Sequence, residues 1–225
     1  MGPCLTAPLK NDTITTTIER KYIMNQKLFT ESFQEIMQEK PIEEDKSKDL
    51  SLAKLFDLPN LSQGSRIKLG NRFELTINRY LKNFKKVTSF KDDSSSLWMN
   101  TKTNEVISDG AGKGMKDIDI LFTKDMTTYY LESKTNLNLD TEKSHATIEK
   151  VKTITNCLKN NVDYPNVTGK VFSPFWDETN VPISARIKKS GMIMWFSELN
   201  DILELGLTKS SWVDMCKEFG KQIKE

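Results

Sequence analysis

Four charged side chains whose types suit metal and phosphate chemistry occur in the segment 116–136: Asp117, Asp119, Glu132 and Lys134. The segment contains two short strand patterns, and the polar turn between them is centred on Asp125 and Met126. Two strand patterns joined by so short a turn predict an antiparallel hairpin. The hairpin would bring these four charged residues together on neighbouring strands.

The position of the turn decides which residues face each other. A turn centred between its two middle residues places Asp119 opposite Glu132 and Asp117 opposite Lys134. Directly opposed Cβ atoms lie about 4.5–5.5 Å apart, so the charged groups would be close. The other face of the hairpin is nearly all apolar and is expected to face the core. It carries Ile118, Ile120, Phe122, Tyr129, Leu131 and Ser133.

The predicted charged face requires a compensating cation, because Asp119 opposite Glu132 would destabilise a hairpin. Carboxylate oxygens are hard ligands that suit Mg²⁺. We therefore expect a Mg²⁺ site at these two carboxylates, with Lys134 able to orient a water beside it. Two alternatives stay open: a register shift of two residues would make Asp117 the ligand, and a solvated hairpin with an Asp117–Lys134 ion pair would need no metal.

The spacing of these residues resembles the motif of the PD-(D/E)XK nucleases: Asp119, twelve intervening residues and then Glu132-Ser133-Lys134. The resemblance covers roughly residues 65–160, and the ESKTN segment is similar to type II restriction endonucleases. The chain departs from the family pattern at Ile118, where the name of the family has proline.

The resemblance implies that Asp119, Glu132 and the backbone carbonyl of Ser133 bind one or two Mg²⁺ ions and that Lys134 positions the nucleophilic water. It also implies a catalytic role for Glu74, on the preceding helix, for which a surface position is the alternative. The implied activity is hydrolysis of double-stranded DNA at a short sequence. A homodimer would cut one strand with each subunit, and its two-fold symmetry would match a palindromic site.

Further residues are candidates for contacts with DNA. Lys113 and Lys116 accompany the glycine-rich stretch 110–114, which lacks the features of a phosphate-binding P-loop and is expected to be a loop near a DNA phosphate. Asn136 follows the motif directly. Arg186 and Lys188 belong to the polar stretch 177–189, whose residue types suit phosphates and base edges but also suit an ordinary surface loop.

The elements that must position these residues predict an α/β fold. The first twenty residues are expected to be an arm, and the charged run 40–49 a connector. Helical spacing indicates a helix that ends before Pro41, a second from about Ser65, a third beginning at Asp140 or Thr141, and closing helices over 197–205 and 209–224. The second helix would carry an apolar stripe of Ile67, Phe73, Ile77, Leu81 and Phe84, and the third a stripe of Ile148, Val151, Ile154 and Leu158. Strand-like runs occupy 171–176 and 192–196. We expect a restriction-endonuclease-like mixed β-sheet flanked by helices, with an N-terminal helical segment.

The length of 225 residues indicates one nuclease domain over 1–225. Within it, 1–60 would be an N-terminal arm and helical segment, 65–160 the catalytic core, and 161–225 C-terminal strands and helices. The net charge of +2 provides no strong global field, so any DNA-binding surface must be local. Three cysteines without metal-ligand spacing and a single histidine exclude a zinc site of thiolates or imidazoles.

The odd cysteine number and the absence of a long apolar run predict a soluble, cytoplasmic protein without a membrane span. The function expected is that of a type II restriction endonuclease. Two other functions stay open: a structure-selective repair or junction nuclease with the same catalytic residues, and a non-catalytic DNA-binding module whose acidic face is vestigial.

Overall fold

The computed structural model describes residues 11–38, 55–58, 63–84, 86–91, 96–108, 110 and 112–224. Its helices are α1 (Asn11–Gln38), α3 (Gln63–Asn83), α4 (Thr141–Lys159), α5 (Ala185–Ser190), α6 (Phe196–Ile202) and α7 (Lys209–Lys224). Its strands are β1 (Thr88–Ser89), β2 (Leu97–Asn100), β3 (Glu105–Ser108), β4 (Met115–Ile118), β5 (Ile120–Lys124), β6 (Thr127–Ser133), β7 (Thr168–Ser173) and β8 (Ile193–Trp195).

A mixed five-stranded sheet with the order β1-β5-β6-β7-β8 forms the centre of the fold. Strands β1, β5 and β6 are antiparallel neighbours, whereas β7 is parallel to β6 and β8 is parallel to β7. A small antiparallel sheet with the order β3-β2-β4 stands beside it. The predicted α/β class with a mixed sheet flanked by helices is therefore confirmed.

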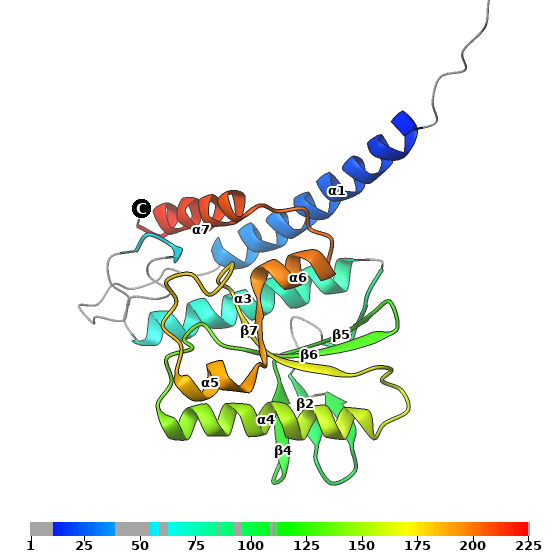
Figure 1. Ribbon diagram of the computed structural model, residues 1–225, viewed down its shortest axis with the longest axis vertical. Coiled ribbons are helices and arrows are strands. Elements are labelled where there is room, and N and C mark those ends of the chain that lie inside the picture. Colours follow the sequence, from blue (N-terminus) through cyan, green and yellow to red (C-terminus); the bar gives the residue numbers. More distant parts are fainter. Residues whose placement is uncertain are drawn as a thin grey trace, which may run out of the picture.

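Helices cover both faces of the central sheet, as Figure 1 shows: α1, α3, α6 and α7 lie on one side, and α4 and α5 on the other. Two separate clusters of buried side chains fill the two interfaces. On β5, Ile120 and Phe122 belong to the first cluster and Leu121 to the second, with Tyr130 of β6 beside it. The prediction of a single apolar face is thus wrong, because both faces of the hairpin are buried.

The hairpin itself forms in the predicted register. Asp125 and Met126 have φ angles of 49° and 60°, as the centre of a type I′ turn requires. The ladder runs from Lys124 opposite Thr127 to Ile120 opposite Leu131.

Beyond that ladder the chain bends at Asp119, and β4 leaves the hairpin to pair with β2. Asp117 consequently lies opposite Trp98 and not opposite Lys134, so that predicted pairing is wrong. The bend also separates Ile118 from Ile120, which pack in different clusters.

Helix α4 begins where its sequence indicates. The Asp140 side chain caps it by accepting a hydrogen bond from the backbone N–H of Lys143 at 2.8 Å. The predicted apolar stripe is buried against the sheet and consists of Ile148, Val151, Ile154 and Leu158. Gly169 of β7 allows this close packing, because a Cβ atom there would collide with the side chain of Thr155.

Helix α3 buries Phe73, Ile77 and Leu81 as predicted, and Phe84 follows just after its end. Ile67 is 57% exposed, so its predicted place on the buried stripe is wrong. Helix α1 begins at Asn11, earlier than the predicted arm allowed, while the arm before it and the charged connector 40–49 lie outside the described residues. Among the helices that the structure describes, none has the length and apolar character needed to cross a membrane.

Candidate active site

The bend at Asp119 is held by side chains from two other segments. Asn78 of α3 donates from Nδ2 to the backbone carbonyl oxygen of Asp119 at 3.0 Å. Lys91 donates from Nζ to the same oxygen and to the carbonyl oxygen of Ile118, both at 3.2 Å. These bonds fix the backbone at the point where β4 and β5 separate.

The bend also turns the carboxylate of Asp119 toward the end of β6. Asp119 Oδ2 accepts a hydrogen bond from the backbone N–H of Ser133 at 2.8 Å. The other oxygen, Oδ1, faces the ammonium group of Lys150 at 3.8 Å. The predicted closeness of Asp119 to Glu132 is therefore achieved through the bend and not through a direct ladder pair.

Lys150 of α4 stands at the centre of the acidic cluster, which we define as Asp117, Asp119 and Glu132. Its Nζ lies 2.6 Å from Glu132 Oε2, 2.9 Å from Asp117 Oδ1 and 3.8 Å from Asp119 Oδ1. Its side chain is 16% exposed. The sequence predicts a metal as the compensating cation, whereas in this structure a lysine provides it.

Glu132 is the most completely bound carboxylate of the cluster. Oε1 accepts from Lys134 Nζ at 2.7 Å, and Oε2 accepts from the hydroxyl group of Tyr130 at 2.9 Å as well as from Lys150. Lys134 is itself fixed at its backbone, where its N–H donates to the carbonyl oxygen of Phe172 at 2.8 Å. The predicted pair of Glu132 and Lys134 is brought together, with the Lys134 side chain 31% exposed.

The pKa values of the two aspartates of the cluster are shifted in opposite directions. Burial, followed by the negative charge of Glu132, raises the pKa of Asp119 to about 7. Asp117 is far more exposed, and although burial opposes it, the hydrogen bond from Lys150 holds its pKa below the ordinary value. For Lys150, burial acts to lower the pKa, but the charges of Asp119 and Glu132 outweigh it and raise the pKa above the ordinary value.

Glu74 of α3 lies beside the cluster and does not contact it directly in the structure. Its carboxylate bonds to Lys91 Nζ at 2.5 Å. Burial raises the pKa of Glu74 against the opposing influence of Lys91, and the charges of Glu132 and Asp117 add to the increase. The predicted residue is therefore near the site, where it orients the lysine that holds the bend.

The residues of the cluster offer the oxygen donors that Mg²⁺ prefers in proteins. In the described part of the chain, no group of three or more carboxylate, imidazole or thiolate side chains has the arrangement of a preformed metal site. The carboxylate oxygens of Asp119 and Glu132 suit a hard divalent cation. In this structure the Nζ atom of Lys150 lies at the position between these two carboxylates.

The residues predicted to contact DNA lie in two separate places, one next to the acidic cluster and the other on α5. Lys113 is exposed in the turn before β4, and Lys116 is partly exposed on β4 opposite Met99. Asn136 uses its Oδ1 to accept from the backbone N–H of Asn138 at 2.8 Å, which fixes the chain after β6. These three residues lie on segments adjoining the acidic cluster.

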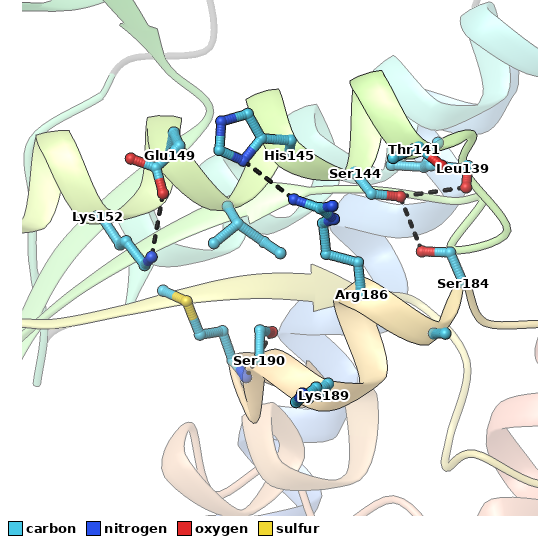
Figure 2. A pocket seen from close by; sticks show the side chains of 13 residues that line it. Leu139, Thr141, Ser144, His145, Glu149, Lys152, Ser184, Arg186, Lys189 and Ser190 are labelled. Carbon is cyan, nitrogen blue, oxygen red and sulfur yellow. Dashed lines mark hydrogen bonds and ion pairs between the residues drawn. The ribbon is translucent and has the colours of Figure 1, made fainter.

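Arg186 and Lys188 lie elsewhere, on α5. A cleft of about 780 Å³ lies between α4 and α5. In it, Arg186 Nη1 lies 3.4 Å from Nδ1 of exposed His145. Figure 2 shows the two side chains directed toward each other. Lys188 pairs with Glu178 at 3.6 Å. Because His145 and Lys150 are five positions apart, they point about 140° away from each other around α4. The cleft and the acidic cluster therefore occupy different sides of this helix.

Three residues of the site are absent from the sequence-based prediction: Lys150, Lys91 and Asn78. Lys150 follows Thr147 by three positions and precedes Ile154 by four, so it lies on the same helix face as these buried residues. A lysine on the buried face of α4 is visible in the sequence and indicates a buried charged contact. Asn78 follows Glu74 by four positions on α3, which places both on one face. Lys91 adjoins the segment 92–95, outside the described residues, and no pattern distinguishes it.

Comparisons of the chain with protein-family models, with curated proteins and with solved structures find no match.

Proposed function

We propose that this protein is a Mg²⁺-dependent endodeoxyribonuclease of the PD-(D/E)XK kind that cleaves double-stranded DNA. The observation that carries the proposal is the convergence of Asp119 and Glu132 beside Lys134 at the end of the β5–β6 hairpin. A hairpin followed by the amphipathic helix α4 also agrees with the common core of these nucleases, as does a mixed sheet covered by helices.

The roles of the residues follow from their positions. Asp119 Oδ1 and Glu132 would hold the cation, together with the backbone carbonyl of Ser133. When bound, Mg²⁺ would stabilise the charge on the scissile phosphate and lower the pKa of a bound water. Lys134, partly exposed beside Glu132, would orient that water toward phosphorus. Glu74 would act through Lys91 by keeping the Asp119 bend in place.

The finer proposal is a type II restriction endonuclease that acts as a homodimer at a palindromic site. Lys113, Lys116 and Asn136 would contact DNA near the scissile phosphate. Arg186 and Lys188, on the other side of α4, would contact phosphates away from the cut and contribute mainly to affinity.

Digestion of genome-sized DNA with Mg²⁺, followed by sequencing of the ends, tests the proposal and its finer form together. Ends at one recurrent short sequence would support a restriction endonuclease. Cutting of branched or damaged DNA alone would assign the same cluster to a repair or junction nuclease.

An absence of cutting with every substrate, combined with retained duplex binding, would contradict the enzymatic proposal. Lys150 gives that outcome a structural explanation, because a cluster already neutralised by lysines can be purely structural. The same digestion by a Lys134→Ala variant distinguishes activity of this site from a contaminating nuclease.

A further inference from the structure

The ammonium groups of two lysines already lie beside the three carboxylates of the acidic cluster. Lys134 binds one oxygen of Glu132, and Lys150 binds the other oxygen as well as Asp117. A divalent cation between Asp119 and Glu132 would have to lie where the ammonium group of Lys150 now lies, since that group is within 4 Å of both carboxylates. The two cations repel each other and cannot share this position.

We infer that Lys150 is a displaceable counter-cation that occupies the metal position and moves onto Asp117 alone when a divalent cation binds. This inference rests on the proposed function, because it concerns the same carboxylates. It assigns separate roles to the two aspartates: Asp119 binds the metal, and Asp117 receives the displaced lysine.

The geometry permits such a movement. Lysine carries its charge on a flexible four-carbon stem, and the partial exposure of Lys150 gives its end a path toward water. Asp117 already holds the ammonium group at 2.9 Å and is 59% exposed, whereas Glu132 is 3% exposed. The lysine can therefore leave the buried carboxylates while keeping its exposed partner.

Displacement has a cost that sets the affinity for the metal. A divalent ion must break the contact of Lys150 with Glu132, which is the shortest contact in the cluster. The lysine thus stabilises the metal-free protein and weakens metal binding. The site would then be filled only at divalent-cation concentrations high enough to compete with an attached ammonium group.

The parent protein can be tested without any substitution by amine acylation followed by peptide mass spectrometry. We expect Mg²⁺ to increase the rate of Lys150 acylation several-fold, because the ammonium group moves out toward solvent. Exposed Lys159, at the end of the same helix, is the internal control and should react at a constant rate. If calorimetry shows Mg²⁺ bound while Lys150 stays equally protected, the inference is wrong.

Calorimetry with Mn²⁺ on two variants gives a second test. Lys150→Met should bind Mn²⁺ on the order of tenfold more tightly than the parent, a typical strength for coupling between two sites. Lys152→Met, two positions further along α4 and 55% exposed, is the matched control and should keep the parent affinity. Equal or weaker Mn²⁺ binding by Lys150→Met would overturn the inference.

A double-mutant cycle separates the roles of the aspartates. Asp117→Asn should weaken Mn²⁺ binding in the parent, because the lysine loses its second partner, and should have no effect in the Lys150→Met background. Weakening in both backgrounds would make Asp117 a ligand and contradict the inference. If neither the parent nor any variant binds Mn²⁺ or Mg²⁺, the proposed function fails together with it.

Discussion

Replacement of Lys150 by methionine should destabilise the metal-free protein strongly, because it removes the cation that Asp119 and Glu132 share. Removing one partner of a buried ion pair costs about 3–5 kcal/mol. Three features of the site reduce that figure: Asp117 is exposed to water, Lys134 still pairs with Glu132, and Asp119 can take up a proton. We therefore expect a loss of about 2–4 kcal/mol at pH 8.

For a chain of this length, 1 kcal/mol corresponds to roughly 2–4 °C in the midpoint of thermal unfolding. A loss near the middle of the range would lower Tm by about 6–12 °C, measured by circular dichroism in the presence of EDTA. Lys152→Met, whose lysine is exposed on the same helix, should change the free energy of unfolding by less than about 0.5 kcal/mol.

The loss caused by Lys150→Met should be smaller at pH 6 than at pH 8, since a protonated Asp119 needs no counter-cation. Equal stability of Lys150→Met and the parent at pH 8 would contradict this prediction. It would show that the three carboxylates do not depend on this ammonium group for their placement.

The pKa of Asp119 is raised from 3.8 to about 7, so the stability that its protonation contributes is present at low pH and is lost as the pH rises through 7. When the pH is lowered from 8 to 6, the parent should therefore gain more stability than Asp119→Asn. Parallel thermal melts of the two proteins at both pH values measure the difference. Asn78→Ala should lower the free energy of unfolding by about 0.5–1.5 kcal/mol in urea unfolding, because the carbonyl of Asp119 loses one of its two donors and keeps Lys91; no measurable loss would contradict a role of Asn78 in holding the bend. Gly169→Ala should destabilise by about 1–3 kcal/mol, and adding Thr155→Ala should recover most of the loss; a lack of recovery would mean that the collision is not the cause. Arg186→Ala should weaken duplex binding similarly for all sequences and reduce the salt slope by about 1, whereas an unchanged slope would exclude a phosphate contact.

Much of the framework could be predicted because local rules determine it. The turn at Asp125 and Met126 set the hairpin register, and both residues have the positive φ angles that the turn needs. The cap at Asp140 and the stripe beginning at Ile148 placed α4. Each of these features depends on residues that are close in sequence.

The course of the chain before the hairpin could not be predicted in the same way. Strand β4 leaves the hairpin because Asn78 and Lys91, distant in sequence, bind the carbonyl groups at the bend. Alternation of apolar and polar residues suggested one buried face, but helices cover both faces of β5 and β6.

The sequence predicts a cation between Asp119 and Glu132, but it did not reveal that a lysine from another element takes that position. Lys150 lies on an element that reaches the cluster only after α4 packs on the sheet. A pattern within the hairpin alone contains no information about that contact. Metal binding by Asp119 and Glu132 stays a prediction.

Incubation of supercoiled plasmid DNA with the pure protein and Mg²⁺ tests directly whether Asp119, Glu132 and Lys134 form a nuclease site. We predict open-circular and linear products from the parent protein, and none with EDTA or with folded Asp119→Ala and Lys134→Ala variants. Equal cutting by the parent and by these two variants, or no cutting by the parent at any Mg²⁺ or Mn²⁺ concentration, would contradict the assignment of phosphodiester hydrolysis to this site.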